Sequence, residues 1–174
     1  MSAAMRLSPL LPLLPALVAA PLARAAAPPP ATGPVPLGTF SQWIAATYNE
    51  GGQKICYAFT RPTASTPVIP GRGEVLLSVT ERPGVRDEAA LTAGFPYAKG
   101  ATVTVDVGST RLSFYTAGGA AFARDDGAAV RAFTVGVTAV AHSPAPDKKM
   151  VADDFNLDGF TAAHNAIVKA CPPG

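Results

Sequence analysis

A strict alternation of apolar and polar residues most constrains the fold of this chain. Between Thr102 and Val107, three valines alternate with threonine and aspartate, so an extended backbone would place the valines on one side. Residues 111–115 alternate in the same way after a turn at Gly108–Thr110. The two segments predict a β-hairpin with one buried face.

The same period predicts further short strands along the chain. They cover residues 43–48, 55–60, 74–80, 89–95 and 137–142, and turn signals separate several of them, at Asn49–Gly52 and Arg82–Gly84. We expect about six to eight strands in total. The fold class predicted is mainly β: a single antiparallel β-rich domain of sandwich or roll type with a C-terminal α-helix.

Two helices are expected among these strands. Asp125 and Asp126 begin one that reaches Phe133, because acidic side chains favour the positive end of a helix. The other covers residues 159–170, with Asp158 as its N-cap. Its apolar stripe recurs at three and four residues and consists of Phe160, Ala163 and Ile167.

The N-terminal region has the pattern of a secretory signal peptide. Arg6 precedes an uncharged run rich in Leu and Ala, which ends in Ala23-Arg24-Ala25, so we expect residues 1–25 to be removed. Prolines interrupt this run, which makes a retained membrane anchor the poorer alternative. We expect a Pro/Ala-rich linker at 26–37, a folded domain at 38–174 and no membrane span in the mature protein.

The charge balance argues against a nucleic-acid partner. The whole chain has 14 Lys and Arg residues against 12 Asp and Glu residues. Two of the basic residues, Arg6 and Arg24, lie in the predicted signal peptide, so the mature chain would carry 12 of each sign. Nucleic-acid binding needs a basic excess that this chain lacks.

Cys56 and Cys171 are the two cysteines of the chain. An even pair in an exported protein usually oxidises, so we predict a disulfide between them. Two unpaired buried thiols are the alternative. A catalytic thiol is less favoured, because Cys56 lies within a predicted strand and Cys171 is followed at once by two prolines.

A possible calcium motif lies at residues 154–159, which match the first half of an EF-hand loop. The last ligand position of such a loop is Asn165, where a bidentate Glu is required. We therefore interpret Asp158 as a helix cap and Asp153 and Asp154 as a solvated strand end, and we expect no bound cofactor or metal.

The other chemistry-bearing residues do not form a recognisable site. His142 and His164 lack a third zinc ligand at suitable spacing, and a partly buried, hydrogen-bonded state is expected for His164. No serine lies in a Gly-x-Ser-x-Gly motif, and the paired glycines lack the Lys of a phosphate loop. We assign no catalytic, cofactor-binding or metal-binding residue.

Four arginines fall in two neighbouring connections of the predicted sheet. They are Arg61, Arg72, Arg82 and Arg86. Together they could form a patch for an anionic partner, but solvated loop side chains are the favoured interpretation.

A series of short motifs extends in a fixed order over about residues 40–171. They are Phe40-Ser41-Gln42-Trp43, Lys54-Ile55-Cys56-Tyr57, Val79-Thr80-Glu81-Arg82-Pro83, Gly94-Phe95-Pro96-Tyr97, the run from Asp154 to Ala163, and Cys171. In this order they resemble the invasion-associated locus B (IalB) family of exported bacterial proteins. The resemblance implies a periplasmic or secreted, β-rich domain with paired cysteines and no assigned catalytic residue. It also implies a link to host-cell invasion in the founding members, in which a Cys often follows the Phe-x-x-Trp opening; this chain has none there.

The sequence thus predicts an exported, non-enzymatic module that binds or supports an envelope or surface protein. A small envelope hydrolase or lyase with an unrecognised active site is the alternative. A concave pocket with convergent titratable groups would favour the enzyme, and a broad exposed apolar surface would favour the binding module.

Overall fold

The computed structural model describes residues 33–173, so the predicted signal peptide and most of the predicted linker lie outside the described residues. The described part of the chain contains eleven strands and two helices. The strands are β1 (Val35–Phe40), β2 (Trp43–Glu50), β3 (Gln53–Thr60), β4 (Ala64–Thr66), β5 (Leu76–Arg82), β6 (Val85–Thr92), β7 (Thr102–Val107), β8 (Thr110–Ala117), β9 (Ala120–Ala123), β10 (Thr138–Pro144) and β11 (Met150–Asn156). The helices are α1 (Asp126–Val135) and α2 (Phe160–Ala170).

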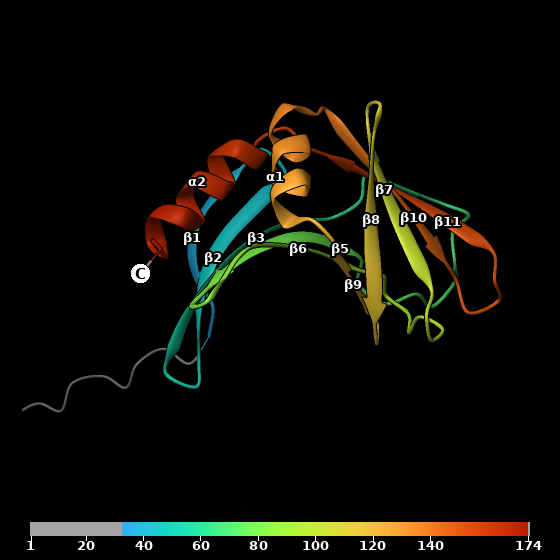
Figure 1. The fold of residues 1–174 in the computed structure, drawn as a ribbon, viewed down its shortest axis with the longest axis horizontal. Helices are drawn as coiled ribbons and strands as arrows, with labels where there is room; N and C mark the ends of the chain where they lie inside the picture. The colour runs from blue at the N-terminus through green and yellow to red at the C-terminus, as the bar shows by residue number, and fades with distance from the viewer. Residues whose placement is uncertain (1–32, 174) are drawn as a thin grey trace, which may run out of the picture. The chain divides into compact units, whose positions relative to one another are not determined.

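All eleven strands belong to one antiparallel sheet, in the order β1-β2-β3-β5-β6-β9-β8-β7-β10-β11-β4. In Figure 1 the half from β1 to β6 arches beneath α1 and α2, and the half that contains β7, β8, β10 and β11 runs steeply beside it. The mainly β, antiparallel fold with a C-terminal helix is therefore confirmed. The strands form one continuous sheet that bends between its two halves (Figure 1), which is the roll type of the two predicted arrangements.

A single apolar core lies between the sheet and the helices. Trp43 of β2 and Phe133 of α1 both meet Phe160 of α2 edge-on, with ring centroids 4.9 Å and 5.5 Å away. The Trp43 indole also donates a 3.0 Å hydrogen bond to the Asn156 carbonyl, so its polar edge is satisfied inside the core. Burying each such side chain stabilises the fold by about 1.5–3 kcal/mol.

Helix α2 packs on β1, β2 and β3 through the predicted stripe, and Phe160, Ala163 and Ile167 are all fully buried. The buried face of β3 carries small side chains, Cys56 and Ala58. These allow the helix to lie close to the sheet. Because an isolated helix of this length is marginal in water, α2 depends on that packing.

The predicted N-cap of α2 is wrong. The helix is preceded by Gly159 in a left-handed conformation with φ 88°, and no side chain caps it. The Asp158 backbone N–H instead donates to Oδ1 of Asn156 at 2.8 Å, which forms a tight turn. A Cβ on Gly159 would lie 2.1 Å from the Phe40 carbonyl oxygen, so glycine is required where the start of α2 passes close to the end of β1.

The predicted start of α1 is confirmed, because the Asp125 side chain accepts a hydrogen bond from the Ala128 N–H at 2.8 Å. The folded part starts earlier than predicted: β1 begins at Val35, within the residues predicted as linker. Its Pro36 lies next to a shift of register, as is usual for proline on an edge strand. None of the described helices is long and apolar enough to cross a membrane.

Candidate functional site

A bulge in the β5–β6 hairpin creates the most unusual polar site of the described residues. Thr80 pairs with Glu88 and Arg82 pairs with Val85, so Glu81 on β5 faces two residues of β6, Arg86 and Asp87. Asp87 adopts the left-handed conformation, with φ 58°. Bulges of this kind redirect side chains and are frequent beside functional sites.

Glu81 is the buried member of this site. Along β5 the buried residues are Leu77, Val79 and Glu81, so an acidic side chain occupies the third inward-facing position of an otherwise apolar strand face. Glu81 is 0% exposed. Its neighbour across the β3–β5 pairing is Cys56.

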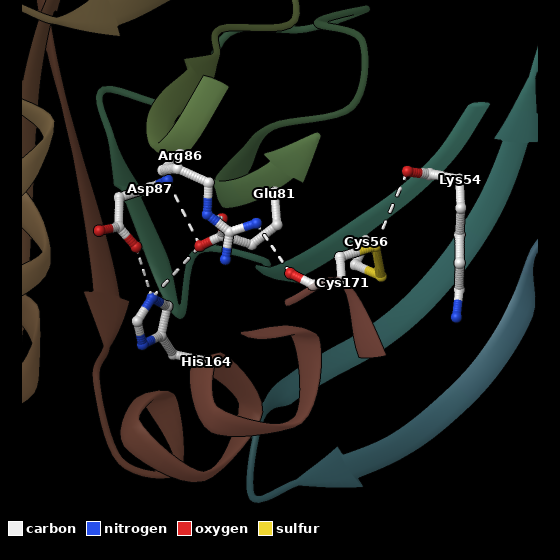
Figure 2. A network of polar contacts seen from close by, with 7 residues as sticks. All are labelled: Lys54, Cys56, Glu81, Arg86, Asp87, His164 and Cys171. Atoms are coloured by element: carbon white, nitrogen blue, oxygen red, sulfur yellow. Dashed lines mark hydrogen bonds and ion pairs between the residues drawn. A yellow bond between two sulfur atoms is a disulfide. The ribbon is translucent and has the colours of Figure 1, made fainter. Parts of the chain in front are cut away.

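His164 reaches the bulge from α2. Its Nε2 lies 2.7 Å from Oδ1 of Asp87 and 3.7 Å from Oε1 of Glu81, and Figure 2 shows the two carboxylates pointing at the same ring nitrogen. The ring is stacked on Phe160 with centroids 5.6 Å apart. The predicted state of His164, partly buried and hydrogen-bonded, is confirmed.

Arg86 connects this cluster to the disulfide. Its Nε lies 2.7 Å from Oε2 of Glu81, and its Nη1 donates to the Cys171 carbonyl at 2.8 Å. The predicted Cys56–Cys171 disulfide is present, with Cα atoms 6.0 Å apart, and it fixes the end of α2 to β3. Lys54 donates to the Ala170 carbonyl at 2.9 Å, so two cations, Lys54 and Arg86, cover the negative end of the helix.

The two carboxylates titrate at different pH. Burial, together with the hydrogen bond and the charge of Asp87, raises the pKa of Glu81 from its ordinary 4.5 to about 7. Arg86 opposes this shift only in part. Burial also acts to raise the pKa of Asp87, but hydrogen bonds with His164 and Glu81 and the positive charges of His164 and Arg86 outweigh it and lower that pKa. Asp87 is therefore the ionised partner and Glu81 the proton carrier near neutrality.

Sequence reasoning missed this cluster because its members come from three separate segments. Glu81, Asp87 and His164 bring three potential donor atoms within 4.8 Å of one another. The only local signal was the position of Glu81, which continues the inward-facing period of Leu77 and Val79. A charge in that position points to a buried polar partner.

A second buried polar centre joins distant parts of the sheet. Arg72, in the connection between β4 and β5, donates from both Nη atoms to the Asp153 carboxylate at 2.7 Å each. Ser65 donates to the same carboxylate at 2.6 Å, and Nε of Arg72 donates to the Ala93 carbonyl. The predicted solvated position of Asp153 is therefore wrong, since it is 0% exposed and fully partnered.

The interpretation of the arginines as solvated holds for Arg61, whose side chain is 57% exposed, and is wrong for Arg72, whose side chain is 6% exposed. The four do not form one patch, although Arg82 and Arg86 line the same groove, and each lies beside a different carboxylate. The pairs are Arg61–Glu74, Arg72–Asp153, Arg82–Glu88 and Arg86–Glu81.

The remaining residues singled out in the sequence lie elsewhere. His142 lies 3.4 Å from Asp106 on the neighbouring strand β7, away from His164. Ser143 is hydrogen-bonded to Tyr97 at 2.9 Å. In the EF-hand-like segment, Oδ1 of Asn156 is used by the turn before α2.

A shallow groove of about 370 Å³ adjoins the disulfide. Its lining includes Lys54, Arg82, Arg86 and the prolines after Cys171, and it does not include Glu81, Asp87 or His164. The convergent titratable groups therefore do not face this groove.

The fold can be compared with that of known proteins. No protein-family model and no curated protein matches the chain. Among solved structures, the crystal structure of invasion associated protein B from Bartonella henselae matches with a TM-score of 0.53 and 18% identity. The match covers 76% of this chain and 96% of that chain. At this identity the likeness concerns the fold, and the β-rich fold implied by the motif resemblance is confirmed: this chain has the fold of invasion associated protein B.

Proposed function

We propose that the protein is an exported member of the IalB family that acts as a non-enzymatic module, binding or supporting an envelope or surface protein. The observation that carries the proposal is the Cys56–Cys171 disulfide within a fold like that of invasion associated protein B. Such a bond persists in oxidising compartments and is rare in the cytosol. The N-terminal signal-peptide pattern supports the same periplasmic or secreted destination.

The non-enzymatic part of the proposal is supported by the way the titratable groups are used. Glu81 is fully buried and contacts Arg86 through one oxygen and His164 through the other. The groove beside the disulfide is lined by cations that already bind carboxylates or helix-end carbonyls. The contacts of Lys54, Arg86 and Glu81 with residues 164–171 hold α2 on the sheet, which is a structural role.

Export is tested by expressing the full chain in a bacterial host and separating cytoplasm, periplasm and medium. We expect the mature protein outside the cytoplasm, beginning at Ala26 by intact mass and resistant to thiol alkylation. A control with Leu13→Arg and Leu14→Arg in the apolar run should stay in the cytoplasm with both thiols free, because the signal peptide can no longer insert. An unprocessed wild-type chain with reduced cysteines would overturn the proposal.

The binding role is tested by crosslinking the exported protein in intact cells, followed by capture from the native envelope. We expect one or a few envelope proteins to be crosslinked in a manner that survives washing at high salt. The reduced and unfolded protein serves as the control for nonspecific adhesion. If the folded protein captures nothing beyond this control, the binding role fails, whereas the export result stands by itself.

A further inference from the structure

We propose that Glu81, Asp87 and His164 bind a divalent transition-metal ion, best matched by Zn²⁺, on the inner side of the β5–β6 bulge. This site goes beyond the proposed function and does not depend on it. Its three donors are Oε1 of Glu81, Oδ1 of Asp87 and Nε2 of His164, which all lie within 4.8 Å of one another.

The spacing of the donors suits zinc. With bonds of about 2.0–2.1 Å, two ligands of a tetrahedral zinc ion lie roughly 3.3 Å apart. Nε2 of His164 lies 2.7 Å from the Asp87 oxygen and 3.7 Å from the Glu81 oxygen, values on either side of that separation. Changes of about 0.6 Å and 0.4 Å would bring these two separations to that value, and the third pair of donors, Oδ1 of Asp87 and Oε1 of Glu81, lies within 4.8 Å.

The charges of the cluster leave a place for a cation. Arg86 lies against Oε2 of Glu81, on the side away from His164, and Oε1 is left to face the cluster. Within residues 33–173, Oε2 of Glu81 accepts no hydrogen bond although it is fully buried. Arg86 therefore acts on it as a nearby positive charge and not as a well-aligned hydrogen-bond donor. With both carboxylates ionised and the imidazole neutral, as in a metal-bound cluster, Arg86 balances only one of the two negative charges, and a divalent ion would balance the rest.

The site also has the support and access that a metal needs. Stacking on Phe160 fixes the orientation of the His164 ring, and the Asp87 backbone N–H donates to Oε1 of Glu81 at 3.3 Å. The side chains of His164 and Asp87 are 17% and 35% exposed, so the cluster lies close to the protein surface and water can supply the fourth ligand. On binding, the ion takes the place of the proton between Nε2 and Oδ1, and His164 ligates as the neutral imidazole.

The donor set separates zinc from the common alkaline-earth ions. Ca²⁺ takes six to eight oxygen ligands, and Mg²⁺ requires an octahedral shell of oxygens. An imidazole nitrogen with two carboxylates suits zinc and its transition-metal neighbours. We therefore expect Zn²⁺ to bind far more tightly than Ca²⁺ or Mg²⁺.

The two histidines of the chain provide an internal control. The first measurement is NMR of the imidazole resonances of the oxidised protein, titrated with zinc chloride after treatment with a chelator. We expect the His164 signals to shift and saturate at one equivalent, while those of His142, which has only Asp106 as a carboxylate contact, stay in place. Equal shifts at both histidines would mean surface binding and would overturn the proposal.

The second measurement is calorimetry with Zn²⁺, Ca²⁺ and Mg²⁺ on four proteins: the wild type, His164→Asn, Asp87→Asn and His142→Asn. We expect zinc affinity to fall at least tenfold in His164→Asn and Asp87→Asn and to be unchanged in His142→Asn. Circular dichroism tests whether each variant is folded, and Asp87→Asn should fold because the Asp87 side chain is partly exposed. Unchanged zinc affinity in both cluster variants, or tighter binding of Ca²⁺, would overturn the assignment.

Discussion

The Arg72–Asp153 pair and the Glu81–Asp87–His164 cluster both place charged side chains inside the same roll, but their charges are balanced differently. Arg72 meets the Asp153 carboxylate with two parallel hydrogen bonds, and Ser65 adds a third. In the cluster, two carboxylates share one histidine, and Arg86 reaches only the far oxygen of Glu81. In the Arg72–Asp153 pair every charge has a counter-charge, whereas the Glu81–Asp87–His164 cluster can still bind a proton or a cation.

This difference separates a structural role from a potential binding role. A bidentate, fully desolvated pair has nothing to offer a ligand, since each donor and acceptor is already used. A carboxylate pair in a bulge, with one pKa raised to about 7, carries an imbalance that a proton or a cation can relieve. Breaking each centre in turn should therefore give different kinds of effect.

The largest effect is expected from Asp153→Ala. Removing this carboxylate leaves Arg72 buried without a counter-charge, because the two side chains are only 0% and 6% exposed. The free energy of unfolding in urea should fall by about 3–5 kcal/mol. The double variant Arg72→Met/Asp153→Leu should recover most of this loss, and a single variant that costs less than about 1 kcal/mol would show that the pair is not desolvated.

The next effect is expected from the double variant Cys56→Ser/Cys171→Ser. Loss of the bond should lower the free energy of unfolding by roughly 2–5 kcal/mol. Amide exchange should accelerate first in residues 160–170, because α2 is then held by packing alone. An unchanged melting temperature under oxidising conditions, with the same exchange pattern, would contradict the role of the bond in holding α2.

A third test concerns pH and uses Glu81→Gln in the presence of EDTA. The folded pKa of about 7 exceeds the ordinary 4.5, so the folded state holds an extra proton between these values. Stability from Glu81 is then fully present below about pH 4.5 and is lost as the pH rises to about 7, by roughly 3 kcal/mol in total. Asp87, whose pKa is lowered, is ionised in both the folded and the unfolded state across this pH range, so it does not change the direction in which stability depends on pH.

The measurement is the unfolding free energy of wild type and Glu81→Gln at several pH values between 4.5 and 7.5. The wild type should lose stability relative to the glutamine variant as the pH rises. Glu88→Gln, beside Arg82 on the same hairpin, is the matched control. A difference between wild type and Glu81→Gln that is independent of pH would refute the raised pKa.

The smallest effect is expected from Arg61→Ala. Arg61 and Glu74 form an ion pair with both side chains more than half exposed, at 57% and 55%. Water and salt screen such a pair, so its removal should change the unfolding free energy by less than about 1 kcal/mol. A loss comparable with that of Asp153→Ala would show that burial is not what distinguishes the two ion pairs.

Local patterns predicted the fold better than the site. The hairpin of β7 and β8 follows from the alternation of Thr102–Val107, and α2 follows from the spacing of its apolar stripe. Strand β1 was missed because Pro36 and the prolines before the strand resemble linker sequence, although backbone pairing with β2 determines its structure. Strand β9 was missed because a short run of alanine and phenylalanine shows no alternation.

The polar centres could not be predicted, because each depends on residues far apart in the chain. Asp153 was assigned to solvent, since its partner Arg72 is 81 residues away. His164 lies 77 residues from Asp87, and only the position of the bulge brings the two together. The composition of the chain and the period of its apolar residues carry no information about contacts between such distant residues.

The place of β4 in the sheet has a consequence for how the chain folds. Although β4 follows β3 in sequence, it pairs with β11 at the opposite edge. Ala64–Thr66 therefore cannot reach their final pairing until Met150–Asn156 has been made. Pairing over such a long stretch of chain is slow, so this edge should close late. During synthesis the chain would pass through a stage in which its central hairpins are formed and β4 is still unpaired, because β11 has not yet been made.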